Sequence, residues 1–304
     1  MKALRVRVPA TSANLGPGFD AFALALPLLA EFEVRTSRGY EVRIEEDGDG
    51  IPSGASNLVV VAARATAKAA RQQLAGLQIV QRSSIPTARG LGSSAAAVVA
   101  GCVAANEVLG RPLDRQSLLR TAARVEGHPD NVAAALMGGF TIAAPSNEGP
   151  LATSLAFPRA WRAVIFVPER RLSTHQARSV LPRRVARADA VFNLAHTALF
   201  VAAVLRKDGT LLRMAMHDRL HEPARMRLVP ALDFVGRAAR AAGAFGAVLS
   251  GAGPSVLAIA PTRLAPRVAA AMAAVGEEEG WLGAAHVMRV RAIGAQAREH
   301  EAAD

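Results

Sequence analysis

A glycine- and serine-rich segment at residues 86–97 has the composition of a phosphate-binding loop. Gly90 and Gly92 allow backbone N–H groups to turn toward one point, and Ser93 and Ser94 place hydroxyls where a helix is expected to begin. The first turn of a helix has unpaired N–H groups and a partial positive charge, which together attract phosphate oxygens. A serine hydroxyl there could also be a ligand for Mg²⁺. The segment therefore predicts a polyphosphate site.

The spacing excludes two better-known phosphate loops. A Walker A loop needs Gly-Lys-Ser/Thr, and the lysines of this chain are Lys2, Lys68 and Lys207. The glycine spacing also differs from that of the dinucleotide-binding fingerprint. The alternative is purely structural: a tight turn capped by serine, followed by a buried, alanine-rich helix.

The elements that must position this loop alternate irregularly between strands and helices. Residues 77–81 are typical of a strand before the loop, and residues 94–109 of a helix after it. Residues 32–35 and 40–45 are expected to form a strand pair around a turn at 37–39. The remaining expected elements are strands at 4–9 and 161–168, helices at 58–76, 115–125, 188–206, 232–242 and 264–275, and a strand–loop–strand unit at 245–260. This order predicts an α+β fold rather than a doubly wound parallel sheet.

A break rich in proline, glycine and serine occupies residues 145–150, near the middle of the chain. We expect it to separate two domains, residues 1–150 with the phosphate loop and residues 151–304. Residues beyond about 290 are read as a charged tail and are assigned no element.

The composition is that of a folded protein and excludes wholesale disorder, because 51% of the 304 residues are hydrophobic and 20% are charged. Lys+Arg 36 against Asp+Glu 25 gives a net charge of +11. A nucleic-acid-binding protein is one explanation, but the arginines are spread along the chain without interleaved aromatic residues for base stacking. We attribute the charge to a general composition bias and expect no nucleic-acid partner.

Cys102 is the single cysteine, which excludes an intrachain disulfide and a cysteine-based zinc site. It lies in an apolar run and is expected to be a small core residue. The apolar runs at 21–30 and 95–105 are shorter than the roughly 20 residues that cross a bilayer. Residues 1–5 do not resemble a signal peptide. We therefore expect a cytoplasmic protein with no membrane partner.

Three motifs occur in the order that the GHMP kinase superfamily shows. They are residues 9–20 (PATSANLGPGFD), the loop at 86–97 (PTARGLGSSAAA) and residues 246–255 (GAVLSGAGPS). The chain resembles this family over nearly its whole length. The resemblance implies a two-lobed fold, with an N-terminal ribosomal-protein-S5-like domain and a C-terminal ferredoxin-like α/β sandwich domain. It also implies ATP and Mg²⁺ as cofactors, and a homodimer.

Within the superfamily, the residues of these motifs resemble those of the homoserine kinases most closely. The similar segments are residues 11–20, 126–132, 173–182 and 221–225. The resemblance implies an enzyme that transfers the γ-phosphate of ATP to the hydroxyl of L-homoserine, giving O-phospho-L-homoserine on the route to threonine.

The resemblance assigns residues to the nucleotide and to its metal. Ser94 and Glu126 would hold Mg²⁺. Several relatives place this glutamate farther ahead of the His-Pro-Asp-Asn segment, so either the intervening loop is shortened here or Glu126 is not the ligand. The residues expected to contact ATP or its phosphates are Pro86, Arg89, Gly90, Leu91, Gly92, Ser93, Ser94 and Ala95, with Asn57 near the base.

A zwitterionic amino acid needs a cation for its carboxylate and an anion for its ammonium group. Arg178 and Arg225 are the candidates for the carboxylate, because a planar guanidinium can bind two oxygens at once. Asp20 is the candidate for the ammonium group. The alternatives are surface ion pairs for the two arginines and a turn-capping role for Asp20. The residues expected to contact homoserine are Asn14, Asp20, His128, Asn131, Arg178, Arg225 and Gly251.

His128, Asp130 and Asn131 are expected around the acceptor hydroxyl as the catalytic residues. Asp130 would either take the proton of the hydroxyl or bind the substrate. Its structural alternative is the N-cap of a helix that starts at Asn131, and that of His128 is a loop histidine before a proline.

Two other functions stay open on the sequence. One is another GHMP-type kinase, acting on an isoprenoid precursor or a sugar. An isoprenoid precursor has no ammonium group, so Asp20 would then have no partner in the substrate. The other is a ligand sensor of the same fold without turnover, which the presence of Ser94, Asp130 and Asn131 disfavours.

Overall fold

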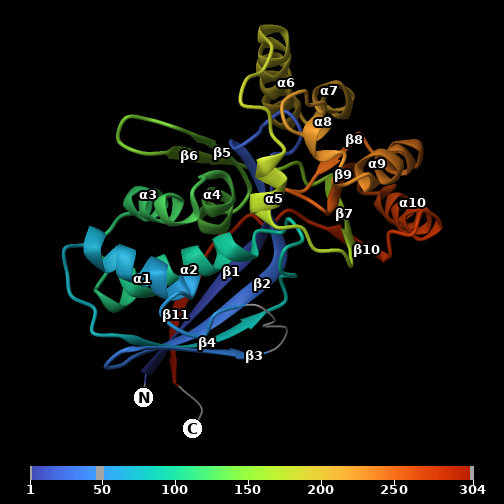
Figure 1. Cartoon of the computed structure of the whole chain (residues 1–304). Coiled ribbons are helices and arrows are strands. Elements are labelled where there is room, and N and C mark those ends of the chain that lie inside the picture. Colours follow the sequence, from blue (N-terminus) through green and yellow to red (C-terminus); the bar gives the residue numbers. More distant parts are fainter. Residues whose placement is uncertain (1, 46–50, 302–304) are drawn as a thin grey trace.

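The computed structural model describes residues 2–45 and 51–301, and two β-sheets organise these residues (Figure 1). Within the described residues the larger sheet has seven strands, in the order β11-β1-β2-β4-β3, with β5 paired to β2 and β6 paired to β5. Their bounds are β1 Lys2–Ala13, β2 Phe22–Thr36, β3 Tyr40–Glu45, β4 Leu77–Ser83, β5 Phe140–Ala144, β6 Leu151–Leu155 and β11 Gln296–Glu301.

The smaller sheet is antiparallel, with the strand order β10-β7-β9-β8. Its strands are β7 Trp161–Pro168, β8 Gly246–Leu249, β9 Val256–Pro261 and β10 Gly283–Met288. Helices and two sheets without a regular βαβ order confirm the expected α+β fold.

Alternation along the strands decides which face of the larger sheet is covered. In β1, Val6 and Val8 are fully buried, whereas the side chains of Arg5 and Arg7 are exposed beside Glu31, with Arg7 Nε 2.6 Å from its carboxylate. One face of the sheet is therefore apolar and the other carries ion pairs.

Four helices cover the apolar face of the larger sheet (Figure 1). They are α1 Leu58–Ala69, α2 Ser93–Val108, α3 Arg115–Glu126 and α4 Asp130–Met137. α2 lies in the middle of this layer and is apolar on all sides, as a buried helix is. Cys102 in α2 is 1% exposed, which confirms it as a core residue.

The smaller sheet joins the two larger hydrophobic clusters of the described residues. Ala163 and Ile165 of β7 belong to the larger hydrophobic cluster, the main core, which also contains buried residues of β1 and α2. Val164 and Phe166 point to the other side, toward α9 Ala231–Ala241 and α10 Ala265–Glu278. Because successive residues of one strand serve two cores, the parts around the two sheets are packed on each other.

Four further helices lie between β7 and α9, namely α5 Thr174–Ser179, α6 Arg187–Arg206, α7 Gly209–Ala215 and α8 Glu222–Arg225. Of the helices in the described part of the chain, α6 is the one long and apolar enough to cross a bilayer by length and composition, a test that core helices also pass. Phe200 and Ala203 anchor α6 in the main core, and Thr197 Oγ1 donates a hydrogen bond to Pro17 O over 2.9 Å.

The expected pairing of residues 32–35 with residues 40–45 is wrong. Both segments are strands, but β4 lies between them, antiparallel to β2 and parallel to β3. The insertion gives β4 a hydrogen-bonded neighbour on each edge and buries its Leu77 and Ile79 completely. The helix expected at 58–76 is also shorter, because α1 ends at Ala69 and Arg71 takes φ 54°.

The division of the chain at residue 150 stays a prediction. The break at 145–150 is the turn of a hairpin between β5 and β6, and Ala144 pairs with Leu151 across it. The strand pairings thus place residues 151–155 with the larger sheet. The supposed tail also contains β11, which returns to this sheet and pairs antiparallel with β1.

Candidate active site

One cavity of about 310 Å³ collects the predicted site residues from segments far apart in the chain. Ala95 is the exception, because it is completely buried in α2 and does not line the cavity. The predicted residues that line the cavity are Asn14, Asp20, Asn57, Pro86, Arg89, Gly90, Leu91, Gly92, Ser93, Ser94, Glu126, His128, Asp130, Asn131, Arg178, Arg225 and Gly251.

The glycines of the predicted phosphate loop are required by close backbone contacts. Gly90 and Gly92 have φ 71° and 70°. A Cβ on Gly90 would lie 2.1 Å from Ser250 O, and one on Gly92 would lie 1.9 Å from Thr11 Oγ1. The loop is thus pressed against Thr11 of β1 and against Ser250, which follows β8, in a left-handed conformation that favours glycine.

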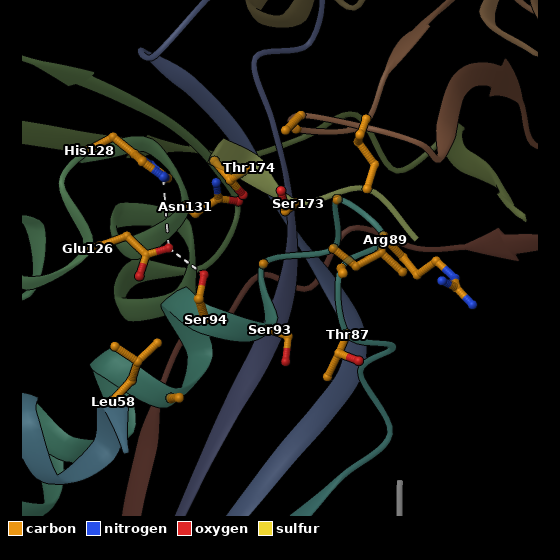
Figure 2. Close-up of a pocket in the computed structure, with 18 of the residues that line it drawn as sticks. Leu58, Thr87, Arg89, Ser93, Ser94, Glu126, His128, Asn131, Ser173 and Thr174 are labelled. Atoms are coloured by element: carbon orange, nitrogen blue, oxygen red, sulfur yellow. Dashed lines mark hydrogen bonds and ion pairs between the residues drawn. The ribbon is translucent and has the colours of Figure 1, made fainter. Parts of the chain in front are cut away.

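α2 starts directly after this loop, at Ser93, and Gly92 is its N-cap without a side-chain hydrogen bond. The first N–H groups of α2 therefore have no capping side chain, as an anion site requires. Figure 2 shows the hydroxyls of Ser93 and Ser94 pointing to different sides of the helix start.

The side chains of Ser94 and His128 both approach the carboxylate of Glu126 at the start of α2, Ser94 through a hydrogen bond and His128 at ion-pair distance (Figure 2). Ser94 Oγ donates to Glu126 Oε1 over 2.5 Å, and His128 Nε2 lies 3.9 Å from the same oxygen. Burial raises the pKa of Glu126, an effect that the hydrogen bond from Ser94 and the charge of His128 partly offset. A carboxyl group in this position favours the arrival of a cation.

The Ser94 hydroxyl and the Glu126 carboxylate fit Mg²⁺ as donors. Mg²⁺ prefers hard oxygen ligands, and it is usually held by one or two carboxylates together with substrate phosphates and water. The described residues contain no cluster of three or more His, Cys, Asp and Glu side chains that would form a complete protein cage. The site thus suits a metal ion that arrives with a nucleotide.

Asp130 is the first residue of α4 and lies 2% exposed beside His128. Its Oδ1 accepts hydrogen bonds from His128 Nδ1 and from the backbone N–H of Asn131, both over 2.6 Å. Burial lowers the pKa of His128, but the hydrogen bond to Asp130 and the nearby carboxylates outweigh it, so the pKa is raised. The N-cap of α4 is Pro129, so the capping alternative for Asp130 is wrong.

The N-terminal motif is held to the third motif by the side chain of Asn14. Asn14 Nδ2 donates to Gly251 O over 2.7 Å, and its Oδ1 accepts the backbone N–H of Asp20 over 2.9 Å. Asp20 in turn accepts two hydrogen bonds from Arg178, over 3.0 and 2.6 Å. Two groups that were expected to hold opposite ends of an amino acid are therefore paired with each other.

Arg225 is 1% exposed, which rules out the surface ion pair as its role. Its Nε donates to Ala177 O over 3.1 Å, and its Nη1 donates to His221 Nδ1 over 3.1 Å. His221 Nε2 then lies 2.9 Å from Gly16 O, so this histidine is neutral and carries its proton on Nε2. No acceptor within the described part of the chain engages Arg225 Nη2, and Arg225 lines the cavity.

Phe19 extends the same group with an aromatic surface. Its ring stacks on His221 at 5.0 Å, and the guanidinium carbons of Arg178 and Arg225 lie 5.8 and 5.4 Å from its centre. Two like-charged side chains thus approach one aromatic ring, an arrangement that the ring quadrupole favours.

Arg89 and Asn57 both line the cavity, but they differ in how many hydrogen bonds their side chains make. Arg89 Nη1 is buried and has no hydrogen-bond partner among the described residues, and burial lowers the pKa of Arg89. Asn57 uses both of its polar atoms to start α1, since its Oδ1 accepts from Val59 N and its Nδ2 donates to Pro52 O.

Sequence reasoning missed several residues of this cavity. Ser173 and Thr174 line it, and Figure 2 shows both near Asn131. Ser173 is the N-cap of α5 in a capping box with Gln176, a sequence signal that marks a helix start but no ligand site. Phe19, which approaches Arg178 and Arg225 but does not itself line the cavity, had no signal beyond its place in the N-terminal motif.

Comparison with known proteins agrees with this geometry. Residues 28–139 match the family described as "GHMP kinases N terminal domain", and residues 200–278 match "GHMP kinases C terminal". The homoserine kinase of Desulfitobacterium hafniense is 40% identical, with 96% of this chain and 99% of that protein covered. The homoserine kinase of Moorella thermoacetica is 44% identical, with 90% and 93% covered.

Solved structures give the same result. The crystal structure of homoserine kinase from Cytophaga hutchinsonii superimposes with a TM-score of 0.89 at 32% identity, covering 97% of each chain. A mevalonate kinase structure from L. major, at 16% identity and a TM-score of 0.69, shares the fold alone. With identities of 40% and more over nearly the full length, this chain belongs to the homoserine kinase family of GHMP kinases.

Proposed function

We propose that this protein transfers the γ-phosphoryl group of ATP to the hydroxyl of L-homoserine. One observation carries the proposal: a single cavity unites a phosphate loop, the Ser94–Glu126 pair and the guanidinium groups of Arg178 and Arg225. The names of the relatives support the substrate, since they are homoserine kinases.

The nucleotide phosphates would bind at the start of α2. The uncapped N–H groups of its first turn are the available donors, and Arg89 lines the same cavity. Ser94 and Glu126 would hold Mg²⁺, which when bound neutralises charge on the phosphates. Phosphoryl transfer passes through a loose transition state, so alignment and charge stabilisation supply most of the rate.

The amino acid would bind around Phe19. The free Nη2 of Arg225 suits one carboxylate oxygen, and Arg178 suits the other. Asp20 would accept hydrogen bonds from the ammonium group while it keeps its contact with Arg178. The two charged groups of the substrate would then lie on either side of the existing Arg178–Asp20 ion pair.

Asp130 is the candidate to receive the proton of the attacking hydroxyl. All its hydrogen bonds within the described residues are made by Oδ1, which leaves Oδ2 unengaged. The hydroxyl oxygen would attack the γ-phosphorus as ADP departs, and the proton would pass to Oδ2. Near-normal turnover of Asp130→Asn at saturating substrate would exclude this role.

The test is a coupled assay of ADP release with ATP and Mg²⁺, in which L-homoserine, L-serine, L-threonine, mevalonate and galactose are compared. We expect selectivity for L-homoserine. In Arg225→Lys the KM for L-homoserine should rise at least about tenfold, because an ammonium group cannot bind a carboxylate through two N–H groups as a planar guanidinium does. The matched control is Arg267→Lys, at an exposed position of α10. Turnover of another acceptor would overturn the substrate, and ATP binding without turnover of any acceptor would favour a sensor.

We further propose a homodimer that acts in the cytoplasm, without nucleic-acid or membrane partners. Support comes from the family to which the chain belongs. Light scattering coupled to size exclusion tests the dimer. Retention on immobilised nucleic acid that falls steeply with salt would contradict the expected absence of a nucleic-acid partner.

A further inference from the structure

A second cavity lies where the chain crosses between the two sheets. Its volume is about 640 Å³, and none of the predicted site residues lines it. One wall comes from the end of β6, the start of β7 and the segment that joins them, and another from Arg289, Val290 and Ala292, between β10 and β11. These are the two places where the backbone passes from one sheet to the other.

Three arginines line this cavity, namely Arg159, Arg162 and Arg289, and no acidic residue does. Throughout residues 2–45 and 51–301 none of the three has an ion-pair partner, whereas Arg7, exposed on the larger sheet, pairs with Glu31. Their positive charge is therefore uncompensated within the described part of the molecule.

Arg162 is held in a defined position. Its Nη1 donates to Arg159 O and to Trp161 O, both over 2.8 Å. Arg162 and Arg289 line the same cavity, and burial and then the charge of Arg289 lower the pKa of Arg162. Like charges gathered in one cavity repel, and an anion between them would remove that cost.

Apart from Ser154, whose hydroxyl donates to Gly138 O, the rest of the lining is apolar and partly aromatic. Phe157 and Trp161 meet edge to face, with ring centres 5.6 Å apart, and Leu155 and Val290 complete the surface. Trp161 packs onward against Phe245, so this wall is continuous with the core. Guanidinium groups and aromatic rings that line one cavity suit a ligand with one charged and one apolar end.

We propose that this cavity binds a small organic anion, with its acidic oxygens on Arg159, Arg162 and Arg289 and its apolar or aromatic body on Phe157 and Trp161. A planar guanidinium can bind two oxygens of a carboxylate, phosphate or sulfonate at once. The site is separate from the candidate active site and does not depend on the proposed reaction. Its ligand contacts both crossings between the sheets.

Phenyl phosphate is the probe, because it combines a dianion with an aromatic ring. Its binding to the full-length protein is measured by calorimetry, with the candidate active site occupied by Mg²⁺ and a non-hydrolysable ATP analogue. We expect phenyl phosphate to bind at least tenfold more tightly than inorganic phosphate. The triple variant Arg159→Gln, Arg162→Gln, Arg289→Gln should lose this binding at least tenfold.

The matched control is Arg206→Gln, Arg263→Gln, Arg267→Gln, which removes the same charge from exposed positions that line neither cavity. It should bind phenyl phosphate as the parent does. Equal Kd values for the two triple variants would overturn the proposal, as would equal binding of benzyl alcohol and phenyl phosphate. If the cavity variant fails to fold, the single variant Arg289→Gln, at an exposed residue, replaces it. Its Kd for phenyl phosphate is then compared with that of Arg267→Gln, and equal values would overturn the proposal.

Discussion

At the scale of single residues, the candidate active site depends on carboxyl groups whose burial changes their chemistry. Glu126 is buried beside Ser94, and burial raises its pKa. Such a group is stabilised in its charged form by an adjacent cation. The structure therefore predicts that Glu126 and the metal requirement are linked.

Glu126→Gln should raise the Mg²⁺ concentration for half-maximal activity at least about tenfold, because the amide keeps the shape but not the charge. Measuring the rate of ADP release at increasing Mg²⁺ concentrations gives this half-maximal concentration. Glu107→Gln is the control, since Glu107 lies on α2 with its partner Arg111, away from the cavity. An unchanged Mg²⁺ curve would show that Glu126 is not a ligand.

Glu222 presents the opposite case, a buried carboxyl group without a neighbouring cation site. Its Oε1 accepts the backbone N–H of Leu249 over 2.6 Å, and burial raises its pKa from 4.5 to about 8. Between these values the folded protein binds one more proton than the unfolded chain, so stability falls as the pH rises.

Glu222→Gln should remove this pH dependence, because the amide still accepts from Leu249 and never ionises. The free energy of unfolding of the parent should fall relative to the variant from pH 5 to pH 8, by up to about 1.4 kcal/mol per pH unit. Urea midpoints at four pH values measure the difference. Parallel curves for both proteins would contradict the raised pKa.

At the scale of elements, two other segments pack closely against the proposed phosphate loop at residues 86–97. Ser250 O and Thr11 Oγ1 occupy the space where side chains at Gly90 and Gly92 would be. Thr11 Oγ1 also donates to Asn131 Oδ1 over 2.6 Å, so one hydroxyl links β1, the loop and α4. The three motifs of the sequence are thus one packed unit.

Gly90→Ala should destabilise the protein by about 1–3 kcal/mol, through its positive φ and its contact with Ser250 O, and should raise the KM for ATP. Gly54→Ala is the matched control, because a Cβ added at Gly54 would meet no neighbouring heavy atom within 4 Å. Chemical denaturation and steady-state kinetics measure both effects. Equal stability of the two variants would contradict the close packing of the loop.

At the scale of the whole molecule, the chain closes on itself. β11 passes back from the smaller sheet and pairs with β1 over six residues, from Lys2↔Glu301 to Arg7↔Gln296. Without β11, β1 would be an edge strand with unpaired N–H and C=O groups.

Deletion of residues 296–304 should therefore lower the free energy of unfolding by at least about 2 kcal/mol, a large part of a typical net stability, and promote aggregation. Deletion of residues 302–304 alone serves as the control. Thermal unfolding and light scattering compare the two proteins. A protein of full stability without β11 would show that the pairing contributes little.

The sequence by itself determined the features that depend on near neighbours. The glycines and serines of residues 86–97 predict a loop and a helix start, and α2 begins at Ser93. The apolar run around Cys102 predicts a buried helix, as observed. The order of three motifs indicates the family. Such patterns reflect local backbone preferences and burial, which do not depend on residues far away in the sequence.

Only the tertiary structure decided which distant groups meet. Arg178 and Asp20 are 158 residues apart and form one ion pair, and β4 separates two strands that looked like a hairpin. β11 lies in a segment with the composition of a tail. These features follow from the packing of whole layers, in which each strand and side chain takes the partner that buries the most apolar surface and leaves the fewest polar groups unpaired.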